Sequence, residues 1–90
     1  MDPMKLEIFV TAKDCGSIYK AALLLKKSPS DIEEAILALE KELGATVFTP
    51  HETPRLTCEG QMLYLHALDI LDSWYVAQGI ISQLQETNRC

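Results

Sequence analysis

Only two residues, Lys26 and Lys27, lie between Leu25, the last apolar residue of one predicted helix, and Ser28, which begins the next, and this tight connection constrains the fold more than any other feature of the chain. The earlier helix spans about residues 18–26. The later one begins at Ser28, an N-cap residue, and Pro29 fits its first position, where a missing N–H costs nothing. Two helices joined this closely have the spacing of a helix-turn-helix.

Capping residues set the bounds of three short helices. Asp2 and Pro3 begin the first and Gly16 ends it, Ser17 caps the second, and Gly44 ends the third. Apolar side chains recur at helical spacing in each, which predicts a shared core. These residues are Leu6, Phe9 and Val10, then Ala21, Ala22 and Leu25, then Ile32, Ala35, Ile36, Leu39 and Leu43.

A proline-containing connection and one long helix follow. Val47-Phe48 and Arg55-Leu56 are short extended segments, and the two prolines within residues 49–54 forbid a helix and suit a hairpin loop. These features predict a two-stranded wing. Thr57 is the expected N-cap of the last helix, which runs over about residues 58–86.

The last helix carries more apolar surface than a chain of 90 residues can bury in its own core. One stripe repeats with alternating spacings of four and three over about three heptads: Leu63, Ala67, Ile70, Trp74, Ala77, Ile81 and Leu84. A second stripe lies beside it: Tyr64, Leu68, Leu71 and Tyr75. Both stripes could pack on the chain's own helices, but those helices cover only the first turns. We therefore predict self-association, with the first stripe, Leu71 and Tyr75 as the dimer interface.

Length and composition fit one small soluble domain, with 48% hydrophobic residues, 23% charged residues and a net charge of −5. The sequence has no apolar run long enough for a membrane span and no N-terminal signal pattern, so we expect a cytoplasmic protein that does not contact a membrane. Cys15, Cys58 and Cys90 are scattered and lie near neither histidine, His51 or His66. This arrangement predicts reduced thiols, no disulfide and no metal site.

No enzyme motif is present: the sequence lacks a P-loop, a G-x-S-x-G and an H-E-x-x-H. Adjacent acidic residues such as Glu33 and Glu34 point about 100° apart on a helix, so they do not converge as a catalytic pair. We predict no catalytic residue and no cofactor.

From Phe9 to Gly60 the sequence resembles the DNA-binding domain of LysR-type transcriptional regulators. The resemblance covers about two-thirds of the chain, and its motifs run in order along the sequence. They are Leu6-x-x-Phe9-Val10, Gly16-Ser17-x-x-x-Ala21-Ala22-x-x-Leu25, Ser28, Ile32-x-x-x-Ile36-x-x-Leu39-Glu40-x-Glu42-Leu43-Gly44, Val47-Phe48 and Arg55-Leu56-Thr57-x-x-Gly60. The long last helix corresponds to the linker helix that dimerises in that family.

The resemblance implies a mainly α fold: a winged helix-turn-helix over residues 1–57, and a long dimerisation helix with a short tail over residues 58–90. It also implies that the helix Ser28–Leu43 enters the major groove of double-stranded DNA. The family's groove-facing positions fall on Pro29, Ser30, Glu33, Glu34 and Leu37. The candidate DNA-binding residues are Ser17, Lys20, Lys27, Ser28, Ser30, Glu33, Glu34 and Arg55.

The chain departs from the family pattern on the DNA side. Pro29 takes the place of a usual glutamine, and Glu33 and Glu34 replace a usual serine and a frequent arginine. Leu37 and Ala38 occupy frequently basic positions, and Pro50 matches an arginine of the wing. Residues 16–48 contain four lysines and five carboxylates, for a net charge of 4 − 5 = −1.

Two functions therefore stay open. The first is a DNA-binding transcriptional regulator, or its DNA-binding part, that acts as a homodimer. The second is an interaction module that keeps the fold and the dimerisation helix without DNA affinity, and that pairs with a related regulator as a heterodimer or binds another protein through the acidic helix. The match to the family's fold favours the first function, which we adopt. The acidic helix, which would repel phosphates, and the surplus apolar surface of the last helix favour the second.

Overall fold

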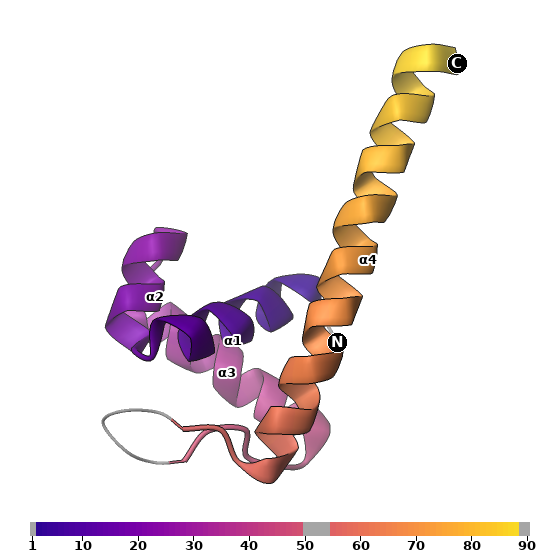
Figure 1. The fold of residues 1–90 in the computed structure, drawn as a ribbon. Coiled ribbons are helices and arrows are strands. Elements are labelled where there is room, and N and C mark those ends of the chain that lie inside the picture. The colour runs from indigo at the N-terminus through magenta and orange to yellow at the C-terminus, as the bar shows by residue number, and fades with distance from the viewer. Residues whose placement is uncertain (1, 50–54, 89–90) are drawn as a thin grey trace.

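The computed structural model describes residues 2–49 and 55–88, with side chains through residue 85. It contains four helices (Figure 1): α1 (Pro3–Cys15), α2 (Ile18–Leu25), α3 (Pro29–Leu43) and α4 (Cys58–Asn88). All four predicted helices are confirmed, with bounds that differ by no more than about two residues. The predicted hairpin loop at 50–54, which includes Pro50 and Pro54, and the tail at 89–90 lie outside the described residues.

The predicted caps are present at both ends of the short helices. The Asp2 carboxylate accepts from the Met4 amide at 3.0 Å and so satisfies one free N–H at the start of α1. Gly16 and Gly44 end α1 and α3 with φ of 66° and 68°, the left-handed region in which a side chain is unfavourable. Because these signals involve only neighbouring residues, they could be read directly from the sequence.

The core lies where α1 crosses α2, α3 and the first turns of α4. Phe9 is fully buried at its centre, with ring centroids 5.4 Å from Phe48 and 6.5 Å from Tyr64. Ala21 and Ala22 are buried too, and their small side chains let α1 and α3 approach α2 closely. The other large buried side chains at this centre are Leu6, Ile32, Leu39 and Val47.

The two-stranded wing is not confirmed, because the described residues contain no strand. A single antiparallel bridge joins Phe48 to Leu56, extended by a hydrogen bond from the Thr49 amide to the Arg55 carbonyl at 2.8 Å. Each predicted strand is only two residues long, so the two segments have room for one bridge and no ladder.

Gly60 explains how closely this connection packs on α4. A Cβ at Gly60 would lie 2.1 Å from the Val47 carbonyl oxygen, so no side chain fits at this position. The same carbonyl accepts from the Thr57 amide at 3.0 Å, and the Thr57 hydroxyl accepts from the Gly60 amide at 3.0 Å as the N-cap of α4. Backbone contacts therefore hold the start of α4 against the helix-turn-helix.

Beyond its first turns, α4 leaves the body of the molecule and projects away from it (Figure 1), which gives overall extents of 51 × 25 × 19 Å. No described helix is long and apolar enough to cross a membrane.

Candidate nucleic-acid interface

Two serines hold the helix-turn-helix in shape. The Ser17 hydroxyl oxygen accepts from the Lys20 amide at 3.3 Å at the start of α2, and the Ser28 hydroxyl oxygen accepts from the Asp31 amide at 3.1 Å at the start of α3. Capping uses a lone pair of each hydroxyl and leaves its hydrogen available to donate. Both residues can therefore cap a helix and also donate to a phosphate oxygen.

The turn between α2 and α3 depends on an unusual backbone conformation at Lys26, which has φ 58° and ψ 43°. This left-handed residue lets the Lys27 amide donate to the Ala22 carbonyl at 2.9 Å, which closes the end of α2. Lys26 was not among the predicted site residues. No sequence pattern marks this position, since a lysine seldom adopts a left-handed conformation.

The exposed side of α3 follows from its buried side. Ile32, Ile36 and Leu39 face the core, and at about 100° per residue the opposite side carries a row of four exposed side chains. We call this row the α3 ridge: Ser30, Glu34, Leu37 and Lys41. Glu33 is also exposed but lies about a quarter turn away from the ridge. Lys41 was missed in the sequence analysis, although its spacing of four from Leu37 could have identified it.

Two of the five carboxylates in the helix-turn-helix have structural partners. Glu40 accepts from the Val47 amide at 2.7 Å, which fixes the connection to the end of α3. Glu42 pairs with Lys5 of α1 at 3.1 Å. In the described part of the chain no ion pair reaches Glu33 or Glu34. The negative charge that meets an incoming partner therefore comes mainly from these two side chains and Asp31.

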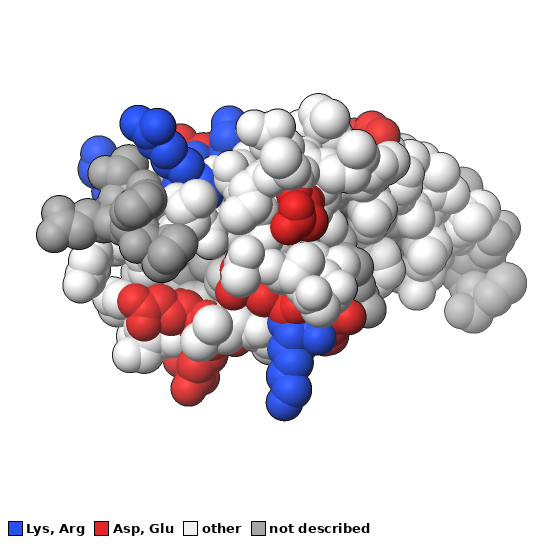
Figure 2. Space-filling model, turned by 90° about the horizontal axis from the view of Figure 1, so that it is seen from below, with Lys and Arg blue, Asp and Glu red and all other residues white. Residues whose placement is uncertain are grey.

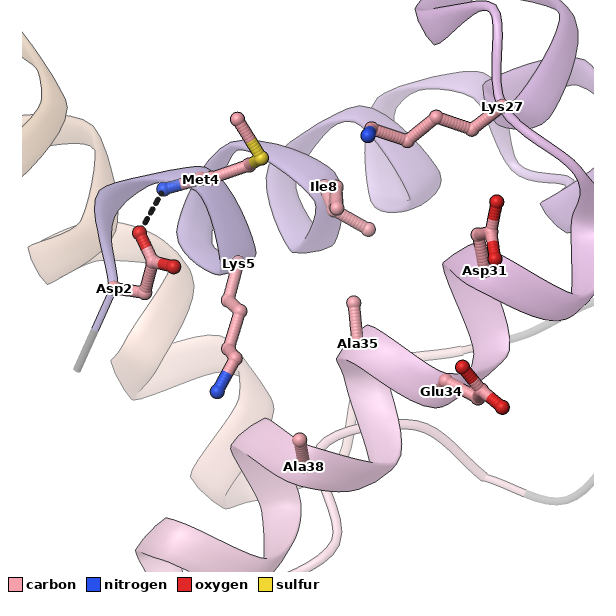
Figure 3. Close-up of a pocket in the computed structure, with 9 residues that line it drawn as sticks. All are labelled: Asp2, Met4, Lys5, Ile8, Lys27, Asp31, Glu34, Ala35 and Ala38. Atoms are coloured by element: carbon pink, nitrogen blue, oxygen red, sulfur yellow. Dashed lines mark hydrogen bonds between the residues drawn. The ribbon is translucent and has the colours of Figure 1, made fainter.

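Lys27 lies nearer to the acidic side of α3 than its predicted phosphate role implies. It lines an open hollow of about 340 Å³ between α1 and α3, which is also lined by Ile8 of α1 and by Asp31, Glu34, Ala35 and Ala38 of α3 (Figure 3). Within the residues whose side chains are described, no ion pair joins Lys27 to either carboxylate. Viewed from below, basic side chains lie at the upper left of the molecule and again at the lower edge, where they stand among acidic side chains (Figure 2).

The remaining predicted DNA-binding residues are also accessible. Lys20 and Arg55 are exposed, on α2 and beside the Phe48–Leu56 bridge. The Arg55 amide donates to the Thr49 hydroxyl at 3.3 Å, so its backbone is held while its side chain remains in solvent. The structure thus places all eight predicted residues on the helix-turn-helix and its wing connection, with only Ser17 half-buried.

The predicted dimer interface divides into two groups. Ala67 and Leu71 are buried in the chain's own core and Leu63 packs against it, so these three side chains leave little surface for a second copy. The rest of the chain packs on the side of α4 that lies between the two predicted stripes. It therefore contacts Leu63 and Ala67 of the first stripe and Tyr64 and Leu71 of the second. The other interface residues are exposed on α4: Ile70, Trp74, Tyr75, Ala77, Ile81 and Leu84.

Hydrogen bonding ties α4 to α1 at the edge of this covered region. The Tyr64 hydroxyl donates to Asp14 at 2.6 Å, and the Lys13 ammonium lies 4.5 Å from the centre of the Tyr64 ring. The hydrogen bond to Asp14, followed by burial and the Asp14 charge, raises the pKa of Tyr64. Burial and then the Glu7 carboxylate raise the pKa of Tyr75 further along α4.

No metal site is evident in the described residues, which contain no group of three or more His, Cys, Asp or Glu side chains arranged to hold an ion.

Solved structures of similar fold include complexes with DNA. The structure aligns with a BenM_DBD complex with catB site 1 DNA at a TM-score of 0.87 and 25% identity, covering 93% of this chain and 94% of that one. It aligns with a CbnR_DBD–DNA complex at a TM-score of 0.83 and 26% identity, covering 96% and 99%. It also aligns with full-length LysG from Corynebacterium glutamicum, with bound effector Arg, at a TM-score of 0.82 and 26% identity, covering 96% of this chain and 30% of that chain.

Sequence relatives give the same family. The transcriptional regulator YtlI of Bacillus subtilis (strain 168) is 30% identical over 86 residues, and HdfR of Yersinia pestis (strain Pestoides F) is 34% identical over 89. These alignments cover 96% and 97% of this chain but only 28% and 30% of the relatives. The family profile for bacterial regulatory helix-turn-helix proteins of the lysR family matches residues 4–61. The chain therefore belongs to the lysR family and corresponds to the DNA-binding domain of a LysR-type transcriptional regulator.

Proposed function

We propose that this chain binds double-stranded DNA as a homodimer and acts in transcription regulation in the cytoplasm, with no catalytic role of its own. The observation that carries this proposal is the alignment of 93% of the chain, helix-turn-helix and α4 together, with BenM_DBD in its complex with DNA. The named relatives are transcriptional regulators more than three times as long as this chain.

In this proposal α3 lies in the major groove and its neighbours contact phosphates. The Ser17 and Ser28 hydroxyls donate to phosphate oxygens at the helix N-termini, where the helix dipoles also favour an anion. Lys20 and Lys27 supply positive charge from α2 and the turn. Residues 47–48 and 55–56 form the base of a wing, from which Arg55 reaches the backbone of the duplex.

The homodimer would form through the part of α4 that leaves the body. Trp74, Ile81 and Leu84 are each about half exposed there and share one side of the helix with Ile70 and Ala77. Pairing two copies along this side would remove a continuous apolar surface from water. It would also place two helix-turn-helix units for two half-sites on one duplex. In this scheme residues 1–57 contact DNA and residues 58–90 mainly join the copies.

We expect DNA affinity to be modest and strongly dependent on salt. Each phosphate neutralised by a lysine or arginine releases counterions, and this chain offers few such side chains per subunit. Glu33 and Glu34 add repulsion from the backbone of the duplex. Tight binding therefore needs low ionic strength or a well-matched base sequence.

A binding titration tests the proposal. Fluorescence anisotropy with mixed duplex fragments, from about 20 to 200 mM salt, should give an affinity that falls steeply with salt. Lys20→Ala and Arg55→Ala should each weaken binding several-fold and reduce the salt slope by about one. Lys13→Ala is the matched control, because Lys13 lies over the Tyr64 ring and should leave the slope unchanged. Equal binding by all three variants would refute the interface.

A second candidate function is supported by Glu33 and Glu34, which are exposed and have no ion pair within the described residues, and by Leu37, which is 63% exposed. A row of acidic and apolar side chains suits a basic protein surface better than a phosphate backbone. Under this alternative the chain would dimerise, or pair with a related regulator, without binding DNA. Intact self-association with no DNA binding at the lowest salt would favour it.

A further inference from the structure

The α3 ridge has a chemistry that differs from a phosphate-binding surface. Its four side chains are, in order, a hydroxyl, a carboxylate, an isobutyl group and an ammonium, and all four are exposed. They lie opposite Ile32, Ile36 and Leu39, so they are the first atoms of α3 to reach the floor of any groove that the helix enters. Side chains at this position read bases, whereas those on the flanks of the helix reach the backbone.

We infer that the α3 ridge selects a pyrimidine step in the major groove, with Glu34 reading cytosine and Leu37 reading the adjacent thymine on the same strand. A carboxylate can only accept, and in the major groove cytosine offers the N4 amino group as a donor. An exposed leucine fits the C5-methyl group of thymine by apolar contact. This inference rests on the proposed DNA binding.

The spacing along the helix fits adjacent bases. Glu34 and Leu37 are three residues apart, which is about 4.5 Å along the helix axis. Successive bases on one strand are about 3.4 Å apart, so the two side chains face neighbouring bases rather than the same one. The Glu34 carboxylate is free to reach a base, since no ion pair holds it within residues 2–49 and 55–88.

Glu33 provides the contrast that makes the inference testable. It carries the same charge as Glu34 but points about 100° away around α3, toward the flank of the helix. A carboxylate there repels the backbone without reading a base. Glu33 and Glu34 should therefore contribute alike to overall repulsion but differently to base preference.

The test is selection of bound duplexes from a random library at low salt, with the full chain and three variants. The parent should enrich a cytosine–thymine step in each half-site. Glu34→Gln should exchange the cytosine preference for adenine, because an amide pairs with adenine N6 and N7. Glu33→Gln and Glu34→Gln should raise total DNA binding by similar factors, because each removes one negative charge. With Glu33→Gln, however, the enriched sequence should stay the same as that of the parent. Leu37→Ser should lose the thymine preference alone.

A chemical substitution in the DNA checks the leucine contact separately. Replacing the selected thymine by deoxyuridine removes only the methyl group. This replacement should weaken DNA binding by the parent by about threefold and leave binding by Leu37→Ser unchanged. If sites are selected but Glu34→Gln and Leu37→Ser enrich the same sequence as the parent, the base assignment is wrong while DNA binding stands. If the parent selects no sequence and binds no duplex at low salt, the proposed function itself is wrong.

Discussion

The two halves of α4 carry similar apolar patterns but lie in different surroundings. In the first half, Ala67 is fully buried and Leu71 is 7% exposed, because α1 packs across them. In the second half Trp74 is 46% exposed and Ile81 is 55% exposed, although they continue the same stripe as Ala67. Periodicity marks the side of a helix that avoids water, and it does not identify the partner that covers it.

The two halves also differ in how closely other parts of the chain approach the backbone of α4. Gly60 in the first half lies against the Val47 carbonyl, whereas Gly79 in the second half has nothing within 4 Å of the position of its missing Cβ. The first half is therefore closely packed against other parts of the same chain. At Gly79 the second half has open space for a side chain, because no other part of the described chain lies near it.

The largest effect should come from placing a charge in the first half. Ala67→Asp would bury an unpaired carboxylate, which costs about 3 kcal/mol or more against a total stability of about 5–15 kcal/mol. We expect loss of the cooperative thermal transition followed by circular dichroism. Ala77→Asp is the matched change in the second half and should keep that transition while weakening self-association. Equal stability of the two variants would remove the distinction between the halves.

Truncating Trp74 should separate the copies without unfolding the chain. By analogy with other buried aromatic deletions, Trp74→Ala should cost about 3–5 kcal/mol of association free energy. Sedimentation equilibrium at micromolar concentration should then find a dimer for the parent and a monomer for the variant. Val76→Ala, an apolar truncation on another side of α4, should remain dimeric. A parent that stays monomeric at high concentration would contradict the proposed homodimer.

Two glycine substitutions should change stability in opposite directions. Gly60→Ala forces a Cβ into the Val47 carbonyl and should lower the free energy of unfolding by about 1–3 kcal/mol. Gly79→Ala meets no neighbour in the chain and should raise it by about 0.5–1 kcal/mol through better helix propensity. Urea titrations of both variants measure the difference. A stabilising Gly60→Ala would mean that α4 does not approach the connection so closely.

The smallest expected effect is the pH dependence of the contact between α1 and α4. The pKa of Tyr64 is raised in the folded state, so its contribution to stability is complete below about pH 10 and is lost as pH rises through the raised pKa. Tyr64→Phe should lower stability by about 0.5–1 kcal/mol near neutral pH and flatten the decline above pH 10.

Tyr19→Phe is the control for this measurement, because Tyr19 is 72% exposed and should leave stability unchanged at every pH. A decline above pH 10 that is equally steep with Tyr64→Phe would show that the Asp14 contact does not contribute to it.

Local sequence determined the helices of this protein. Asp2, Ser17, Ser28 and Thr57 cap helices as predicted, because a cap involves a residue and its neighbours within one turn. The same locality made the tight turn after α2 evident from two intervening lysines. The positions of the candidate DNA-binding residues on this unit followed from the spacing and from the resemblance to a known family.

Tertiary structure decided which surfaces are covered and which charges are free. In the sequence, Glu40 and Glu42 add to the negative charge of the helix-turn-helix in the same way as Glu33 and Glu34. In the fold, Glu40 accepts from the Val47 amide and Glu42 pairs with Lys5. The wing segments form one bridge, and the first half of α4 packs between its two stripes. Each of these outcomes depends on contacts between residues far apart in the chain, which spacing along the sequence does not encode.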